Sequence, residues 1–248
     1  PALPPRLVAA KQADLAITYQ PQLHFFADEG LPLMRVGTLV NTPLNTVITL
    51  DKSITSPAGL QGKTVGYSVS GIEQATLDTM LQHENVHADA VKRVNVNFQL
   101  SSALLAGQVD AVIGGYRNIE ALELQLQGKN PVVFNVEDYG VPAYDELIIV
   151  ANRDAVGEPK IKKFLAALKK GSDYLHAHPQ ESWQAFASAH PELNTELNKQ
   201  AWMKSLPLFA RDPVPLDHQR YQAYEEFLFA NNLIKKITPV EQYATEVR

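Results

Sequence analysis

The sequence contains no cysteine among its 248 residues. This absence excludes disulfide bridges, thiolate metal ligands and a cysteine nucleophile at once, but it does not identify the compartment in which the chain works. The chain also lacks a cluster of basic residues, because its 22 lysines and arginines are scattered and are outnumbered by 27 acidic residues. A nucleic-acid-binding surface needs a basic stripe that displaces counterions from phosphates. No nucleic-acid partner is therefore expected.

Sequence signatures of several other protein classes are missing as well. No apolar run approaches the roughly 20 residues that a helix needs to span a bilayer. The full phosphate-loop motif, G-x-x-x-x-G-K-S/T, does not occur, and no G-x-S-x-G turn marks a serine nucleophile. The chain opens at Pro1 without a recognisable secretion signal and enters a predicted helix almost at once. A processed or truncated N-terminus would explain this beginning.

What the sequence does contain is an alternation of short apolar runs with amphipathic stretches, which is the pattern of strand–helix units and a parallel sheet. The expected strands cover residues 15–19, 35–40, 45–50, 63–69, 91–96, 109–113, 132–136 and 147–151, with helices over 72–82, 100–106 and 118–127. After the last strand only helical spacing of apolar residues recurs. Helices are expected behind Pro159, behind Pro179, over about 196–206, and around 221–228.

Two segments of the chain repeat one pattern. Residues 7–19 (LVAAKQADLAITY) resemble residues 103–116 (ALLAGQVDAVIGGY), each reading as a helix end, a tight turn, an Asp before a buried strand and a Tyr just after it. A unit that occurs twice suggests two lobes of similar design, although chance similarity between two such units is the alternative. Ligands of open parallel sheets bind beyond the carboxyl ends of the strands. Tyr19 and Tyr116 are therefore candidate walls of one cleft, or else boundary tyrosines half buried in their own lobes.

Residues 83–87 (HENVH) have the letters of the H-E-x-x-H zinc motif. That motif needs both histidines on one face of a continuous helix, with the glutamate beside a metal-bound water. Here the helix over 72–82 is expected to end near Glu84, because the following residues lead promptly into the next strand. We therefore expect no zinc site and no other metal centre.

A serine–glycine turn joins the strand over 63–69 to the helix over 72–82. Ser70 and Glu73 have the spacing of a capping box, in which each side chain bonds a free backbone N–H of the first helical turn. With Gly71, the same turn would also present N–H groups and the positive end of the helix dipole to a polar or anionic ligand group. Both roles are compatible, so Ser70 and Gly71 are candidate ligand-binding residues.

Two adjacent carboxylates, Asp145 and Glu146, follow Tyr144 immediately before the strand over 147–151. This strand reads as buried on both faces, so the acids are not simple surface decoration. Glu146 would accept hydrogen bonds from a ligand rich in N–H groups, each contributing about 1.5–3 kcal/mol, or it would form half of a buried salt bridge. Adjacent strand residues point to opposite faces. The two acids therefore cannot easily flank one bond, which argues against a paired-acid hydrolase.

Four segments occur in the order typical of one family, namely 13–20 (ADLAITYQ), 66–75 (GYSVSGIEQA), 107–111 (GQVDA) and 142–147 (PAYDEL). Through them the chain resembles the ABC-transporter solute-binding proteins for the thiamine pyrimidine precursor, which are related to the yeast thiamine pyrimidine synthases. The resemblance spans essentially the whole chain. It implies an α/β chain with the type II periplasmic-binding-protein fold, in which two α/β lobes have a ligand cleft between them.

The resemblance assigns residues 1–52 and 148–248 to the first lobe and residues 53–147 to the second. It implies a non-enzymatic protein of the periplasm, or one tethered outside the membrane, that needs no cofactor. Its partners would be a small heteroaromatic ligand, hydroxymethylpyrimidine or a formylamino analogue, and an ABC permease in the membrane. The candidate ligand-binding residues are Tyr19, Gln20, Ser70, Gly71, Tyr116, Tyr144 and Glu146.

The sequence departs from this family in two respects. The first strand, helix and second strand of the family, with the Trp expected to stack on the pyrimidine, have no counterpart, so the tyrosines are the available aromatic platforms. Related eukaryotic synthases hold iron with His and Cys side chains, and the absence of Cys disfavours that enzyme. Two alternatives stay open: a binding protein of the same fold for riboflavin or an alkanesulfonate, and a pyrimidine-precursor synthase.

Overall fold

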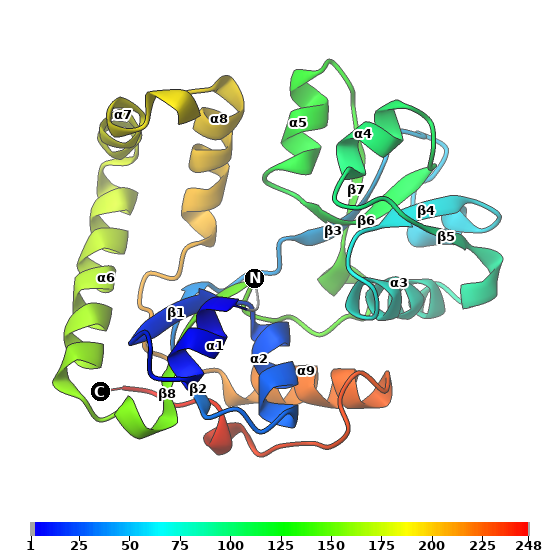
Figure 1. Ribbon diagram of the computed structural model, residues 1–248. Helices are drawn as coiled ribbons and strands as arrows, with labels where there is room; N and C mark the ends of the chain where they lie inside the picture. The colour runs from blue at the N-terminus through cyan, green and yellow to red at the C-terminus, as the bar shows by residue number, and fades with distance from the viewer. Residues whose placement is uncertain (1–2, 248) are drawn as a thin grey trace. The chain divides into compact units, whose positions relative to one another are not determined.

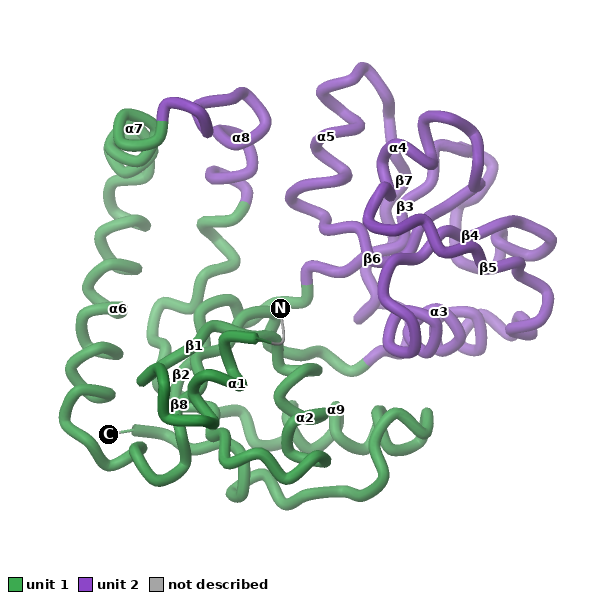
Figure 2. The backbone as a smooth tube through the Cα atoms, in the orientation of Figure 1, with its two compact units in different colours: residues 1–43, 142–190, 205–248 green, residues 44–141, 191–204 purple. Residues whose placement is uncertain are grey.

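The computed structural model describes residues 3–247, and the chain divides into two compact α/β units (Figures 1 and 2). No helix in this described range combines the length and the apolar composition needed to cross a bilayer. Unit 1 comprises residues 1–43, 142–190 and 205–248, and unit 2 comprises residues 44–141 and 191–204.

These units divide the chain at other positions than the lobe boundaries expected after residues 52 and 147. The strand that begins at Asn45 belongs to unit 2 because it pairs with two strands of that unit. The segment 142–147 belongs to unit 1, where Asp145 is bonded to several neighbours. Residues 191–204, expected in the first lobe, are also part of unit 2.

Unit 1 is built on a three-stranded sheet with the order β1–β8–β2, in which both neighbouring pairs are antiparallel. This differs from the expected parallel arrangement, because β8 comes from much later in the chain and lies between β1 and β2. The strands are β1 (Leu15–Thr18), β2 (Leu33–Val40) and β8 (Leu147–Asn152), and the helices are α1 (Leu3–Ala9), α2 (Gln20–Asp28), α6 (Pro159–Ala177), α7 (Pro179–Ala189) and α9 (His218–Ala230).

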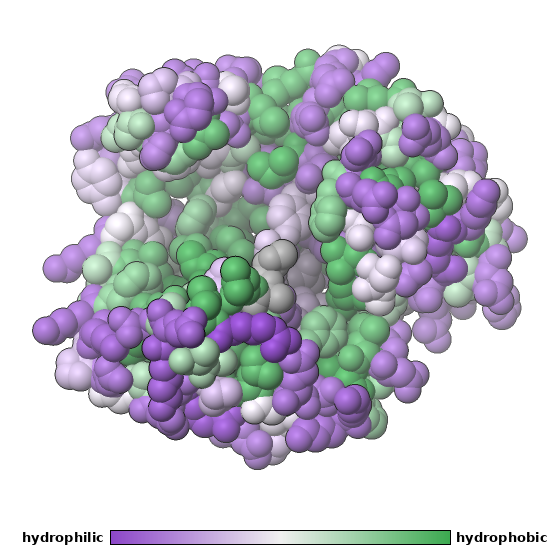
Figure 3. Space-filling model, viewed as in Figure 1, coloured by the Kyte–Doolittle hydropathy of each residue, from purple (hydrophilic) through white to green (hydrophobic). Residues whose placement is uncertain are grey.

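The central strand β8 is buried on both faces because helices cover both sides of the sheet. Ile148 and Val150 point into a core formed with α1, α2 and α9, whereas Ile149 and Ala151 point into a core formed with α6. Successive strand side chains face opposite sides, so a continuous apolar run is what a central strand requires. Hydrophobic residues also reach the surface, where they lie among hydrophilic ones (Figure 3). Leu3, the first residue of α1, is 67% exposed.

Unit 2 is built on a five-stranded mixed sheet with the order β5–β4–β6–β3–β7. β4 pairs in parallel with β5 and β6, while β3 is antiparallel to β6 and β7. Ile48 of β3 and Val112 of β6 pack against α4 and α5. The strands are β3 (Asn45–Thr49), β4 (Thr64–Tyr67), β5 (Lys92–Asn95), β6 (Ala111–Tyr116) and β7 (Val132–Asn135), and the helices are α3 (Ile72–His83), α4 (Leu100–Leu105), α5 (Glu120–Leu126) and α8 (Glu196–Ser205).

The two segments that resemble each other in sequence have the same local backbone. Lys11 and Gly107 adopt positive φ angles of 59° and 65° at the turns that end α1 and α4. The N–H of the next residue, a glutamine in both copies, donates to a carbonyl of the preceding helix over 2.8 Å after Lys11 and 3.0 Å after Gly107. Both are therefore left-handed helix ends of the same kind. The strands that follow differ, since β1 lies at a sheet edge and β6 lies inside its sheet.

Candidate ligand-binding residues

In unit 1 the predicted site residues gather at one edge of the sheet. Thr18, the last residue of β1, pairs with Ile148, and Val40, the last residue of β2, pairs with Leu147. The carboxyl ends of β1 and β2 therefore meet the amino end of β8. This register places the residues after β1 beside the segment that precedes β8.

Gln20, the first residue of α2, is joined to Asp145 by two hydrogen bonds. Its backbone N–H donates to the Asp145 carbonyl over 3.3 Å, and its side-chain Oε1 accepts the Asp145 N–H over 2.7 Å. The amide Nε2 of Gln20 lies 3.1 Å from His24 Nε2. Gln20 is fully buried, and both polar atoms of its side chain are engaged within unit 1.

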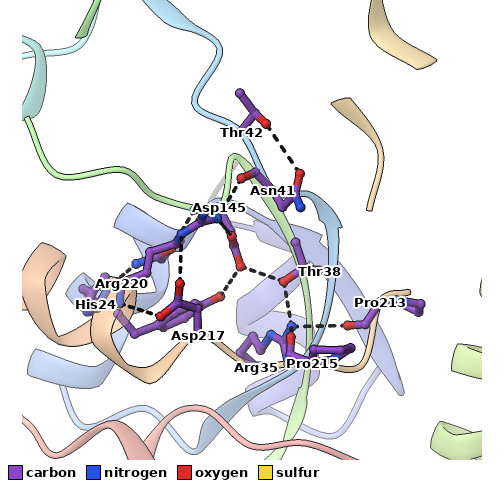
Figure 4. Close-up of polar contacts among 12 residues, drawn as sticks. His24, Arg35, Thr38, Asn41, Thr42, Asp145, Pro213, Pro215, Asp217 and Arg220 are labelled. Carbon is purple, nitrogen blue, oxygen red and sulfur yellow. Dashed lines mark hydrogen bonds and ion pairs between the residues drawn. The ribbon is translucent and has the colours of Figure 1, made fainter. Parts of the chain in front are cut away.

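Asp145 is the centre of a buried polar cluster (Figure 4). Its Oδ2 accepts hydrogen bonds from Thr38 Oγ1 over 2.6 Å and from the Tyr221 hydroxyl over 3.1 Å. Its Oδ1 forms an ion pair with Arg220 Nη1 at 2.6 Å, and the same Nη1 donates to the Asn41 carbonyl over 2.7 Å. Burial and the Asp145 carboxylate both raise the pKa of Tyr221, so its hydroxyl stays protonated and donates. Nothing in the local sequence pointed to Arg220, which comes from α9.

Arg35 extends this cluster from β2 into the C-terminal part of unit 1. Its guanidinium is fully buried and donates to Thr38 Oγ1 over 2.7 Å. The remaining bonds go to backbone carbonyls, which are those of Pro213, Val214, Pro215 and Thr245. Arg35 therefore fastens the 213–215 segment and the C-terminal segment to β2, and through Thr38 it supports the carboxylate of Asp145.

Tyr144 and Glu146 flank Asp145 and are also buried, at 4% and 3% exposure. The Tyr144 ring lies 4.9 Å from the ring of Tyr224. Burial, together with the nearby charge of Glu146, raises the pKa of Tyr224. Tyr19 is half-buried and precedes α2 in an extended conformation, at the carboxyl end of β1. Tyr19, Gln20, Tyr144 and Glu146 thus share one edge of the unit 1 sheet.

In unit 2 the candidate residues lie at the carboxyl ends of two neighbouring parallel strands, β4 and β6. Ser70 is exposed and Gly71 is half-buried in the turn between β4 and α3, whereas Tyr116 is the last residue of β6 and is half-buried. The predicted Ser70–Glu73 capping box is wrong. Gly71, at φ 84°, precedes the helix, and its N–H donates to Gln74 Oε1 over 3.0 Å.

Glu73 and Glu120 instead accept hydrogen bonds from the turns that precede their helices. Glu73 Oε2 accepts from the N–H groups of Ser68 and Val69, over 2.7 and 3.0 Å, and Glu120 Oε2 accepts from the N–H of Tyr116 over 2.7 Å. Burial raises the pKa of both carboxyls, while these hydrogen bonds oppose the shift. Each acid therefore holds a loop that carries candidate ligand-binding residues.

The HENVH segment does not form a shared helical face. The helix α3 ends at His83, as expected, and Asn85 adopts a left-handed φ of 59°. His83 lies 3.4 Å from the Glu84 carboxylate and contacts the ring of Tyr139. Within residues 3–247 no group of three or more His, Asp or Glu side chains is arranged to hold a metal ion.

The architecture described above is that of the periplasmic binding proteins. The periplasmic aliphatic sulphonate-binding protein SsuA of Escherichia coli superposes with a TM-score of 0.80 at 17% identity, covering 100% of this chain and 81% of SsuA. The sequence identifies the family more closely. Residues 1–182 match the model of the NMT1/THI5-like family, and the chain belongs to that family.

Individual relatives show how this family divides. A Haemophilus influenzae protein named for thiamine biosynthesis is 52% identical over 249 residues, which covers 100% of this chain and 79% of that protein. The formylaminopyrimidine-binding protein of Halalkalibacterium halodurans is 33% identical, over 84% of this chain and 64% of that protein. The 4-amino-5-hydroxymethyl-2-methylpyrimidine phosphate synthase of Candida albicans is 25% identical, over 93% of this chain and 70% of the synthase. The relatives of this chain thus include both a binding protein and synthases.

Proposed function

We propose that this chain is the solute-binding component of an ABC importer and captures a thiamine pyrimidine precursor, either hydroxymethylpyrimidine or its formylamino analogue. The observation that carries the proposal is its 33% identity to the formylaminopyrimidine-binding protein, together with the periplasmic-binding-protein fold. The protein would act outside the cytoplasmic membrane, and its partner would be an ABC permease in that membrane.

We propose ligand contacts for each unit taken by itself, at the sheet edges described above. Tyr116, Tyr144 and Tyr19 supply aromatic surface, and an aromatic stack contributes about 0.5–1.5 kcal/mol beyond its burial. Ser70 and Gly71 supply polar groups at the turn before α3, and Glu146 supplies a carboxylate for the N–H groups of an aminopyrimidine. We propose that Gln20 supports this set from inside unit 1, since its side chain is buried and bonded to Asp145.

Calorimetric titration tests the ligand class directly. The panel is hydroxymethylpyrimidine, its formylamino analogue, riboflavin and an alkanesulfonate. We expect saturable heat from one or both pyrimidines and none from the other two compounds. Heat from the sulfonate or riboflavin alone would show that the ligand belongs to that class and is not a pyrimidine. No heat from any compound would overturn the proposal.

Variants of the proposed contacts test the site. Tyr116→Ala and Tyr144→Ala should each weaken pyrimidine binding by roughly threefold to tenfold, whereas the matched Phe variants keep the ring and should bind almost as the parent does. Tyr174→Ala, on the outer helix α6, is a control that should leave the affinity unchanged. Equal affinities in all five variants would remove these tyrosines from the site.

A synthase of the same family is the second candidate, because the Candida albicans synthase aligns with 93% of this chain. That synthase activity would show itself as bound iron or as turnover of a pyridoxal substrate. Metal analysis of the purified protein and incubation with a pyridoxal phosphate substrate separate the two functions. Reversible binding without turnover supports the importer component.

A further inference from the structure

His24 lies inside unit 1 between two hydrogen-bonding partners. Its Nε2 is 3.1 Å from Nε2 of Gln20, and its Nδ1 is 2.7 Å from Oε2 of Glu225. His24 and Gln20 are fully buried, and Glu225 is 1% exposed. The rings of Tyr221, Tyr224 and Tyr243 surround the imidazole, with centroids 5.1–6.1 Å away. Because these side chains are buried, the polar hydrogens of His24 and Gln20 must be donated to acceptors within the protein.

The orientation of the Gln20 amide follows from a backbone group. The Asp145 N–H can only donate, so the side-chain atom 2.7 Å away must be the oxygen of Gln20. The NH₂ group of Gln20 then faces His24. An NH₂ group can only donate, and therefore Nε2 of His24 must carry a lone pair.

The position of the imidazole proton follows in turn. With Nε2 as acceptor, the ring hydrogen is on Nδ1 and is donated to Glu225 Oε2. The other oxygen of Glu225 accepts the Thr238 N–H over 2.8 Å, so both of its oxygens act as acceptors. Burial acts to raise the pKa of Glu225, but the net shift is downward, and hydrogen bonds from His24, Tyr243 and the Thr238 N–H contribute to it. The hydrogen bonds are therefore all donated in one direction, from the Asp145 N–H to Gln20, from Gln20 to His24 and from His24 to Glu225.

We propose that His24 is a positioning residue for the ligand site. Glu225 holds it as the Nδ1–H tautomer, it accepts from Gln20, and Gln20 thereby fixes the backbone of Asp145 between Tyr144 and Glu146. The part of this proposal that concerns the ligand rests on the proposed function above. If the proton moved to Nε2, two donors would face each other and the Gln20 amide would have to turn, which would leave the Asp145 N–H facing an NH₂ group.

The proposal is tested by exchanging the acid at position 225 and the amide at position 20. In Glu225→Gln an NH₂ group replaces one of the two acceptor oxygens, so the proton of His24 should move to Nε2 and the Asp145 bond should be lost. In the double variant Glu225→Gln/Gln20→Glu the introduced carboxylate at position 20 accepts from both His24 Nε2–H and the Asp145 N–H. The hydrogen bonds between positions 20 and 225 are then donated in the opposite direction, but the Asp145 N–H keeps its acceptor.

Two of the three measurements, the His24 tautomer and the Asp145 exchange rate, need no ligand, and the third is pyrimidine affinity. Imidazole ¹⁵N NMR reports the tautomer of His24, and amide hydrogen exchange reports the protection of the Asp145 N–H. We expect Glu225→Gln to shift the proton to Nε2, to speed Asp145 exchange more than tenfold and to weaken pyrimidine binding at least fivefold. The double variant should restore protection and affinity to within about twofold of the parent while the proton stays on Nε2. Glu226→Gln, the same change at the adjacent exposed position of α9, should alter none of these.

The results separate this proposal from the function itself. An Nε2–H tautomer in the parent protein, or unchanged Asp145 exchange in Glu225→Gln, would overturn the positioning role. A double variant that folds but recovers neither protection nor affinity would reduce His24 to a purely structural residue. Should Glu225→Gln fail to fold, Gln20→Glu alone must retain Asp145 protection. If the parent protein binds no pyrimidine, the proposed function is wrong, and so is the role of His24 in ligand binding. The His24 tautomer and the hydrogen exchange of the Asp145 N–H still decide whether His24 positions Asp145.

Discussion

Both units contain buried or half-buried carboxylates, but these carboxylates have different kinds of partner in the two units. In unit 1, Asp145 pairs with Arg220, 75 residues later in the chain, and Glu225 bonds His24, 201 residues earlier. In unit 2, Glu73 and Glu120 bond backbone N–H groups that lie only four or five residues before them. The acids of unit 1 therefore depend on tertiary packing, whereas those of unit 2 are held by the turn that precedes their own helix.

This difference has an electrostatic consequence. Arg220 compensates the Asp145 charge and the interaction with His24 lowers the pKa of Glu225, whereas burial raises the pKa of Glu73 and Glu120 despite their hydrogen bonds. The charged form of Glu225 thus contributes to stability near neutral pH. In unit 2 the charged form carries a desolvation cost, which is offset only in part by backbone dipoles.

Removal of the Asp145 charge should have the largest effect on stability. Asp145→Asn keeps the shape of the side chain but leaves Arg220 without its buried partner, and breaking such a pair costs about 3 kcal/mol. Urea denaturation should show this loss as a lower free energy of unfolding. Asp217→Asn is the matched control, because its contact with Arg220 is 3.9 Å and its side chain is 58% exposed. A change above about 0.5 kcal/mol in that control would contradict the distinction between buried and exposed pairs.

The corresponding experiment in unit 2 uses Gly114, which lies against Glu73. A Cβ at Gly114 would be 2.4 Å from Glu73 Oε1, and the residue has a φ of +96°. Gly114→Ala should therefore cost about 3 kcal/mol through strain and overpacking together. Gly128→Ala, at φ +74° with open space around it, isolates the backbone contribution of about 1 kcal/mol. Equal losses in the two variants would show that Glu73 moves away freely.

The sequence was informative where structure is local. The repeat of 7–19 in 103–116 correctly indicated two helix ends of the same kind, and the early end of α3 followed from the residues after Glu84. The strand pattern found the central strand β8 because burial on both faces leaves a continuous apolar run. Each of these features depends on neighbours within a few positions.

The cluster around Asp145 was out of reach of the same reasoning. Arg220 and His24 look like ordinary polar positions of amphipathic helices, and only the packing of α2 and α9 brings them to Asp145 and Glu225. Gln20 was proposed as a ligand-binding residue through the family segment 13–20, but a sequence segment does not show whether a side chain turns inward. The capping box failed for a related reason, since Gly71 with Gln74 satisfied the helix start instead of Ser70 with Glu73.

The repeated helix ends allow a smaller and more symmetrical test. Lys11 occupies a left-handed position that glycine occupies in the second copy, so Lys11→Gly should raise the free energy of unfolding by about 0.5 kcal/mol. Gly107→Ala has open space around it and should lower that free energy by about 1 kcal/mol through backbone strain alone. The ion pair of Lys11 with Asp154 is highly exposed and adds little. Chemical denaturation of both variants checks the opposite signs, and a stability loss in both would mean that the two turns are not equivalent.

The smallest expected effect is the pH dependence that distinguishes the acids of the two units. A carboxyl whose folded-state pKa is raised stabilises the fold most below its unfolded value, and this contribution is lost as pH rises through the folded pKa. Glu73 and Glu120 should therefore reduce stability as pH rises above the ordinary glutamate range, whereas Glu225, with its lowered pKa, loses its contribution as pH falls. Urea midpoints between about pH 4 and pH 7 measure the slopes. Glu73→Gln should make the slope of the unfolding free energy against pH more positive, because it removes a contribution that falls as pH rises. Glu225→Gln should make the same slope less positive, because it removes a contribution that grows as pH rises. Slopes that change in the same direction in both variants would show that burial does not act differently in the two units.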